Sequence, residues 1–162
     1  MRRKFINEKN SLKFFEDIES KNKKTVFTNG CFDIIHPGHI HLLKESKKLG
    51  DILIVGLNSD KSIKLIKGDD RPIVNENDRV KILESIKYID NILIFEEETP
   101  INLIKLITPD VLVKGGDYLK KDIVGSDFIL ENGGTVKTIP LIEGISTTSL
   151  IKGLNPKDKK HN

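Results

Sequence analysis

One stretch of the chain determines how the whole sequence is interpreted: Thr28-Asn29-Gly30-Cys31-Phe32-Asp33-Ile34-Ile35-His36-Pro37-Gly38-His39. It follows an apolar run typical of a buried strand, and Gly30 lets the backbone come close to an anion. Pro37 suits the first turn of a helix, whose free N–H groups attract negative charge. His36 and His39 are three residues apart and therefore share a face of that helix. The stretch predicts a strand, a glycine turn and a helix that together bind phosphate.

This segment resembles the HxGH signature of the nucleotidyltransferase superfamily, whose members join a nucleotide to a phosphorylated small molecule. Further motifs follow in the order of the family pattern: Val55–Asp60, Lys67–Pro72, Asp78–Val80, Leu112–Tyr118 and Gly144–Thr148. Together the motifs cover nearly everything from Lys24 to Leu154. The chain most resembles the adenylyltransferase half of the enzymes that make ADP-heptose, and it resembles glycerol-3-phosphate cytidylyltransferase more distantly.

The composition favours one domain in a reducing compartment. The chain has 162 residues, which is enough for one ordinary core, and a net charge of +3, which is too small for a nucleic-acid-binding footprint. Its one cysteine, Cys31, excludes an internal disulfide. The basic N-terminus reaches Glu8 and Lys9 before any apolar run develops, so we expect no export signal, no membrane span and a cytoplasmic location.

Short runs rich in Val and Ile alternate with helical patterns, which is typical of a parallel sheet covered on both faces. We therefore expect a Rossmann-like three-layer α/β/α domain with a five-stranded parallel sheet. The predicted strands are Thr25–Thr28, Ile52–Leu57, Asn91–Phe95, Val111–Val113 and Thr135–Ile139. The predicted helices are Pro37–Leu49, Glu76–Tyr88, Pro100–Ile107, Asp122–Glu131 and Thr147–Leu154. This domain would span 24–154, between an N-terminal helical extension at 1–23 and a flexible tail at 155–162.

Three local predictions accompany this scheme. Ser11–Ser20 is predicted to form an extra helix in the N-terminal extension, because Ser11 can cap it and apolar residues recur at helical spacing. Asn75 or Asn77 can cap the helix from Glu76. The segment Lys61–Gly68 is predicted to be a mobile loop after the second strand, with a lysine that closes over the bound nucleotide.

In open parallel sheets the ligand lies beyond the carboxyl ends of the strands, where the strand order reverses. The segments Asn29–His39, Asn58–Asp60 and Lys114–Tyr118 follow the first, second and fourth predicted strands. Ser146–Thr148 lies at the start of the last predicted helix. We therefore expect these motifs to converge on one rim of the sheet.

Nucleotidyl transfer needs alignment and neutralisation of charge at phosphorus rather than a strong base, because the attacking phosphate is already ionised at neutral pH. His36 and His39 are assigned to the triphosphate as hydrogen-bond donors. The resemblance assigns Lys67 to the phosphates as well, and these three residues form the predicted catalytic set. Lys64 is a weaker candidate, since a lysine run is usually a solvated face.

The resemblance implies two further sets of binding residues. The nucleotide and its phosphates would be contacted by Thr28, Asn29, Gly30, Cys31, Phe32, Arg79, Lys114, Gly115, Asp117, Ser146, Thr147 and Thr148. The acceptor would be contacted by Asp33, Asn58, Asp60 and Arg71.

Several of these residues also have ordinary structural interpretations. Asp33 can stabilise a turn, Arg79 can be an exposed first-turn arginine, and Ser146–Thr148 can be a simple helix cap. Phe32 fits a core position and Cys31 fits a small buried hydrophobe. Zinc bound by Cys31, His36, His39 and His41 is an alternative, but the helix after Pro37 explains these residues better, so no protein ligand to a metal is predicted.

The resemblance favours ATP as the nucleotide, because the cytidylyltransferase relatives place an arginine before Glu-Gly-Ile-Ser-Thr-Thr and this chain has none after Arg79. The expected acceptor is D-glycero-β-D-manno-heptose 1-phosphate, and Mg²⁺ would arrive with ATP. A separate sugar kinase would supply the acceptor. The sequence leaves the oligomeric state open and is compatible with a homodimer or a larger homo-oligomer. Two alternatives remain: an enzyme that uses CTP and glycerol 3-phosphate or another sugar or alcohol phosphate, and a catalytically silent nucleotide sensor.

Overall fold

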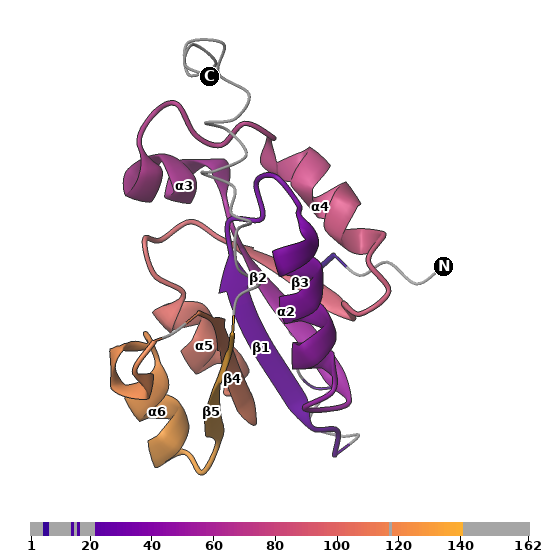
Figure 1. The fold of residues 1–162 in the computed structure, drawn as a ribbon. Coiled ribbons are helices and arrows are strands. Elements are labelled where there is room, and N and C mark those ends of the chain that lie inside the picture. The colour runs from indigo at the N-terminus through magenta and orange to yellow at the C-terminus, as the bar shows by residue number, and fades with distance from the viewer. Residues whose placement is uncertain (1–4, 7–13, 15, 17–21, 117, 141–162) are drawn as a thin grey trace, which may run out of the picture.

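The structure is a computed structural model that describes residues 5, 6, 14, 16, 22–116 and 118–140. Its centre is a sheet of five parallel strands in the order β3-β2-β1-β4-β5 (Figure 1). The strands are β1 (Thr25–Gly30), β2 (Ile52–Asn58), β3 (Asn91–Phe95), β4 (Val111–Gly115) and β5 (Thr135–Ile139). The predicted α/β class and five-stranded parallel sheet are confirmed.

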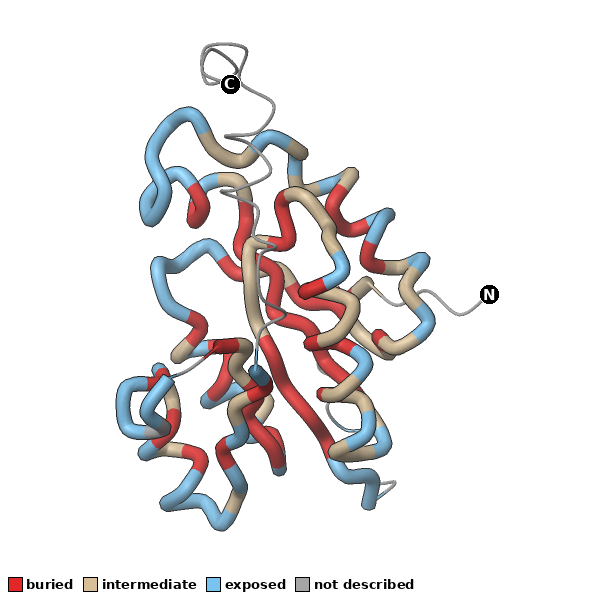
Figure 2. Tube along the Cα trace, in the orientation of Figure 1, coloured by how far each residue is buried: buried red, intermediate tan, exposed pale blue. Residues whose placement is uncertain are grey.

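Helices cover both faces of the sheet, as the nearly continuous apolar strands require. One core lies under α2 (Pro37–Lys47) and α4 (Glu76–Glu84). The other lies under α5 (Ile101–Ile107) and α6 (Ser126–Glu131). Neighbouring strand residues belong to opposite cores, as with Val26 and Phe27, because strand side chains alternate between the faces. The tube in Figure 2 accordingly runs red through the central strands.

The chain order reverses between β1 and β4. The chain passes from β1 outward to β2 and β3, and then crosses back to β4 on the other side of β1. The carboxyl ends of β1 and β4 therefore flank the switch point at which such sheets bind ligands. The structure thus places the ends of β1, β2 and β4 on one rim, as the sequence predicts.

The segment predicted to be a mobile loop is instead the helix α3 (Asp60–Lys67), so that prediction is wrong. Ser59 caps the helix through its side chain, which accepts a hydrogen bond of 3.0 Å from the Ser62 N–H. Ile63 is completely buried and fixes the helix to the domain. The helix ends where Gly68 adopts a positive φ of 91°. Lys67 therefore extends from the last turn of an anchored helix.

The predicted helix over Asp122–Glu131 is shorter than expected. The structure has a 3₁₀ turn, η1 (Lys120–Asp122), and only then α6. Gly125 separates them at a φ of 86°, and a Cβ at this position would lie 2.8 Å from the Ile104 side chain on α5. The close approach of α5 to the start of α6 therefore requires Gly125, which interrupts the helix predicted over Asp122–Glu131.

The other predicted helices have small boundary differences. The helices α2 and α4 end at Lys47 and Glu84, earlier than predicted, and α5 starts at Ile101. Asn75 is the cap of α4, as expected, and its side chain accepts a hydrogen bond from the Asp78 N–H. No helix among the described residues is long and apolar enough to cross a membrane.

Part of the N-terminal extension contacts the domain. Phe5 forms a parallel bridge with Ile92, and the Ile6 N–H donates to the Ile92 carbonyl oxygen at 3.0 Å. Phe14 packs against the core under α5 and α6. Most of the predicted helix Ser11–Ser20, all of Thr147–Leu154 and the predicted tail lie outside the described residues.

Candidate active site

The glycine turn after β1 is shaped around Phe32. This residue has a positive φ of 46°, a conformation that a bulky residue adopts only when its surroundings impose it. Its ring lies so close to Gly30 that a Cβ there would be 3.1 Å from it. The ring centroid of His39 lies 5.1 Å from that of Phe32, which is itself 2% exposed. Phe32 was predicted to contact the nucleotide, but it is the core residue on which His39 rests.

His36 and His39 stand together at the start of α2, with ring centroids 3.9 Å apart. Burial lowers the pKa of His36. Burial, together with the neighbouring His36, lowers the pKa of His39 to about 4. Both rings are therefore neutral at pH 7, and each offers one N–H donor. Two neutral rings can lie this close without the repulsion that two imidazolium ions would have.

Four buried polar atoms on this side of the sheet have no hydrogen-bond partner among the described residues: Thr28 Oγ1, His36 Nδ1, His39 Nδ1 and, further along α2, Ser46 Oγ. Thr28 lies two residues after Val26 on β1, so its side chain faces the same core, under α2 and α4. Buried polar atoms are nearly always hydrogen-bonded in native proteins. The histidine pair beside the glycine turn therefore keeps unmet hydrogen-bonding capacity among the described residues.

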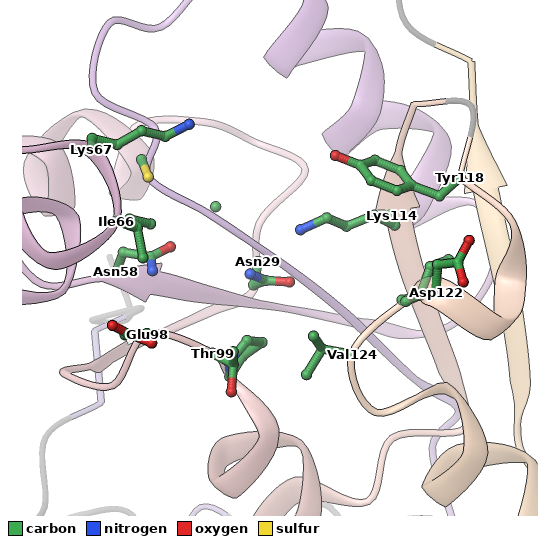
Figure 3. Close-up of a pocket in the computed structure, with 14 residues that line it drawn as sticks. Asn29, Asn58, Ile66, Lys67, Glu98, Thr99, Lys114, Tyr118, Asp122 and Val124 are labelled. Atoms are coloured by element: carbon green, nitrogen blue, oxygen red, sulfur yellow. The ribbon is translucent and has the colours of Figure 1, made fainter.

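A pocket of about 340 Å³ opens at the same rim (Figure 3). Its wall includes Ile123 of the core under α5 and α6, so it lies on the other face of the sheet. The sequence-predicted residues that line it are Asn29, Gly30, Cys31, Asn58, Lys67 and Lys114. His36 and His39 do not line it. The structure therefore divides the predicted site residues between two neighbouring regions.

Lys67 and Lys114 supply the positive charge of the pocket. Figure 3 shows their ammonium groups directed toward the space between them from α3 and β4. Burial lowers the pKa of Lys114, and the charge of Lys67 lowers it further. Burial also raises the pKa of the Cys31 thiol, although Lys67 and the two nearby arginines act in the opposite direction. Cys31 is therefore a protonated lining residue rather than a nucleophile at neutral pH.

Asp33 was predicted to contact the acceptor, but its carboxylate anchors the chain after α3. It is 2% exposed and accepts hydrogen bonds from the Ile73 and Val74 N–H groups at 2.9 and 2.8 Å. The Arg71 Nε donates to it at 2.6 Å. Arg71, also predicted at the acceptor, thereby has part of its guanidinium committed to Asp33. This network holds residues 71–74 against the glycine turn.

Arg79 was predicted near the triphosphate, and the structure places it in the interior with no exposed surface. Its Nη1 donates to the carbonyl oxygens of Cys31 and Asn58, each at 2.7 Å. Its Nη2 pairs with Asp60 at 2.7 Å, and its Nε donates to the Val74 carbonyl. Arg79 and Asp60 therefore form a structural junction that joins β1, β2 and α4 beneath the site.

The sequence analysis missed part of the pocket wall. Glu98, Thr99 and Pro100 line it from the segment after β3, and Asp122, Ile123 and Val124 line it from the end of η1 and the residues that follow. The rule that ligands lie beyond the carboxyl ends of strands could have identified the first group, since β3 ends at Phe95. Gly115 ends β4 without lining the pocket. Asp117 and Ser146–Thr148 lie outside the described residues.

No group of three or more His, Cys, Asp or Glu side chains in the described part of the chain could hold a metal ion. Cys31, His36, His39 and His41 are all described, and they do not form the zinc arrangement weighed from the sequence.

Comparison with known proteins identifies the family to which this geometry belongs. Residues 27–153 match the cytidylyltransferase-like family. The chain belongs to the cytidylyltransferase-like family. It is 49% identical over 96% of its length to "Bifunctional protein HldE" of Aliarcobacter butzleri and 52% identical over 86% to the same-named protein of Helicobacter pylori strain Shi470. The chain spans 33% and 29% of the length of these relatives.

Solved structures agree with the cytidylyltransferase-like fold. A lipopolysaccharide core biosynthesis protein from Thermoplasma volcanium is 31% identical and superposes with a TM-score of 0.59 over 74% of this chain and 97% of that one. Pantothenate synthetase from Thermus thermophilus, at 12% identity, has a TM-score of 0.64 over 99% of this chain and 70% of that one, and supports the fold alone. As a family member with these relatives, the protein is a nucleotidyltransferase enzyme.

The Asp33 network of this cytidylyltransferase-like domain predicts sensitivity to acid. Burial alone would raise the pKa of Asp33, but the hydrogen bonds from Val74, Ile73 and Arg71 outweigh it and lower the pKa below the usual 3.8. A carboxyl group with a lowered folded-state pKa stabilises the protein above its unfolded-state pKa, and this stability is lost as the pH falls through the folded-state value. Asp33→Asn should therefore lower the free energy of unfolding by about 3 kcal/mol at pH 7.

The measurement is urea denaturation at pH 7 and at pH 3. We expect the difference between wild type and Asp33→Asn to shrink at pH 3. The matched control is Asp78→Asn, which removes an exposed carboxylate from the first turn of α4 and should leave the free energy of unfolding nearly unchanged. An equal effect of the two substitutions at pH 7 would contradict an anchoring role for Asp33.

Proposed function

We propose that the protein transfers AMP from ATP to D-glycero-β-D-manno-heptose 1-phosphate, forming ADP-heptose and pyrophosphate for surface polysaccharide biosynthesis. The observation that carries the chemistry is the neutral pair His36 and His39, whose Nδ1 atoms are buried beside the glycine turn without partners among the described residues. The choice of substrates is supported by the motifs shared with ADP-heptose-forming enzymes. The identity of 49% to the bifunctional relative HldE over 96% of this chain supports the same choice.

In the proposed reaction, an oxygen of the sugar phosphate attacks the α-phosphorus of ATP. A new P–O bond forms, the bond between the α-phosphorus and the bridging oxygen breaks, and pyrophosphate leaves with that electron pair. The attacking oxygen is already ionised, so the protein contributes alignment and charge stabilisation. The two histidines donate to oxygens of the triphosphate, and these contacts strengthen as negative charge develops on the leaving group.

Mg²⁺ is proposed to enter with ATP and to neutralise part of the phosphate charge. Because the described residues contain no ready-made group of metal ligands, most of its coordination would come from the phosphates. The sugar phosphate is proposed to come from a sugar kinase reaction, in keeping with the bifunctional relatives of which this chain matches about a third.

The main rival is the same reaction with CTP and glycerol 3-phosphate, and the description of the matching family as cytidylyltransferase-like favours the CTP part of it. The absence of any arginine after Arg79 favours ATP, since the resembling cytidylyltransferases carry one before the last motif. Both reactions would use the same histidines. The rivals therefore differ only in the nucleobase and the acceptor.

The test is release of pyrophosphate by the purified protein with Mg²⁺, offering ATP or CTP with heptose 1-phosphate or glycerol 3-phosphate. We expect release with ATP and heptose 1-phosphate, and rates lower by about 100-fold or more in the other three combinations. Release with CTP and glycerol 3-phosphate instead would keep the mechanism and overturn the substrates. Release with none of the four pairs would contradict the proposed substrates altogether.

A further inference from the structure

The pocket and the histidines lie on opposite faces of the sheet. Phe27 and Leu112 belong to the core under α5 and α6. Asn29 and Lys114 lie two residues further along the same strands and therefore face the same side. His39 rests on Phe32, which belongs to the core under α2 and α4. The carboxyl edge of β1 thus separates two adjoining binding regions.

The pocket suits one small ligand. Its volume of about 340 Å³ is at the lower end of the range of roughly 300–1,000 Å³ that small-molecule sites occupy. This is too little for a nucleotide and a sugar phosphate together. The histidine pair at the start of α2 lies outside this pocket, which leaves the pocket itself to a single ligand.

The charges inside the pocket favour an anion. Neither Lys67 nor Lys114 has an ion pair or a side-chain hydrogen bond within the described part of the chain. Lys114 is partly withdrawn from water, and the charge of Lys67 disfavours its ammonium form. A phosphate group between the two ammonium groups would relieve this repulsion and receive charge-assisted hydrogen bonds from both sides.

The rest of the wall suits the hydroxyls of a sugar. Glu98 and Asp122 contribute carboxylates, and Thr99 contributes a hydroxyl. Carboxylate oxygens accept hydrogen bonds from hydroxyl groups but repel a further phosphate. A monophosphate with a hydroxylated body therefore matches this wall better than a triphosphate does.

We propose that this pocket binds the phosphorylated acceptor, with Lys67 and Lys114 on its phosphate and with Glu98, Thr99 and Asp122 facing its hydroxyls. The proposal rests on the proposed function and deepens it. It assigns Lys114 to the acceptor, whereas the sequence resemblance assigned it to the nucleotide. The acceptor phosphate then approaches the α-phosphorus from the pocket side, and pyrophosphate leaves on the side of the histidines, which is the geometry of an in-line displacement.

Cys31 provides a direct test of occupancy, because it lines the pocket and is the only cysteine of the chain. The rate at which a thiol reagent labels Cys31 would be measured at pH 8.5, where the raised pKa of the thiol still allows slow reaction. The probes, each offered alone, are heptose 1-phosphate, inorganic phosphate and ATP with Mg²⁺. We expect heptose 1-phosphate and inorganic phosphate at saturation to slow labelling by about tenfold, and ATP to slow it by less than about twofold.

Stronger protection by ATP than by the two monophosphates would overturn the proposal. If inorganic phosphate protects Cys31 from labelling and heptose 1-phosphate does not, the pocket binds anions but the proposed sugar phosphate is overturned as its ligand. This experiment uses the wild-type protein and needs no turnover, so its failure is distinguishable from failure of the proposed reaction.

The kinetic test is Lys114→Met, which removes the charge and keeps a side chain of similar length. We expect the KM for the acceptor to rise by about tenfold or more and the KM for ATP to change by less than about threefold. Lys114→Arg should restore part of the loss. The matched control is Lys137→Met on the neighbouring strand β5, where the side chain is exposed and outside the pocket. A rise in the KM for ATP instead would overturn the assignment.

Discussion

Replacement of His39 by alanine is expected to lower kcat by about 10²–10³-fold. The reason is geometric: its ring centroid lies 3.9 Å from that of His36, and its buried Nδ1 has no partner within the described part of the chain. A donor placed there in advance stabilises charge as it develops on the triphosphate, without reorganisation during the reaction. His39 is only partly buried, so its removal should shift the melting temperature by no more than about 5 °C.

The measurement is steady-state kinetics together with a thermal melt. His41→Ala is the matched control, because His41 is a partly buried histidine on the same helix, two residues further along. We expect this control to keep kcat within about threefold of wild type. An unchanged kcat in His39→Ala would contradict its proposed role. A collapsed melting temperature would instead identify His39 as a packing residue.

The largest effect on stability is expected from Arg79→Met. This guanidinium has no exposed surface and joins three backbone carbonyl groups to the Asp60 carboxylate. Removing it leaves the carbonyls of Cys31 and Asn58 without a donor and Asp60 without its cation. The free energy of unfolding should fall by about 3–5 kcal/mol, as for other buried ion pairs broken on one side.

Urea denaturation measures this loss, with Lys81→Met as the control on the same helix. Lys81 pairs with Asp78 through a side chain that is 74% exposed, so its loss should cost less than about 1 kcal/mol. Near-wild-type stability of Arg79→Met, accompanied by a raised KM for ATP, would restore the interpretation of Arg79 as a phosphate ligand.

The fold could be predicted because its signals are local. Each strand is a short run rich in Val and Ile, and Pro37 and Asn75 begin their helices as their side chains predict. The error at Lys61–Gly68 was avoidable, since Ser59, Ile63 and Gly68 supply a cap, a buried anchor and a stop. The segment was predicted to be a mobile loop from which Lys67 closes over the nucleotide, but its three lysines are exposed positions of a short amphipathic helix.

The site was harder to predict because its residues depend on contacts over long sequence separations. The motif pattern identified Arg79 and Asp33, but it could not distinguish residues that contact the substrates from residues that hold the site together. Arg79 reaches the carbonyl of Cys31, and Asp33 holds the N–H groups of Ile73 and Val74, contacts that only the folded chain creates. Strand alternation could have separated Lys114 from the histidines, because it places Lys114 on the face of Leu112.

The central claim is that this chain catalyses transfer of a nucleotidyl group to a sugar phosphate. The most direct measurement uses ATP labelled at the α-phosphorus, with Mg²⁺ and heptose 1-phosphate, and follows the label by chromatography and mass spectrometry. The account predicts that the label moves into ADP-heptose in proportion to the pyrophosphate released, and that His39→Ala slows both together. Label that stays in ATP, or that appears only as free AMP, would contradict it.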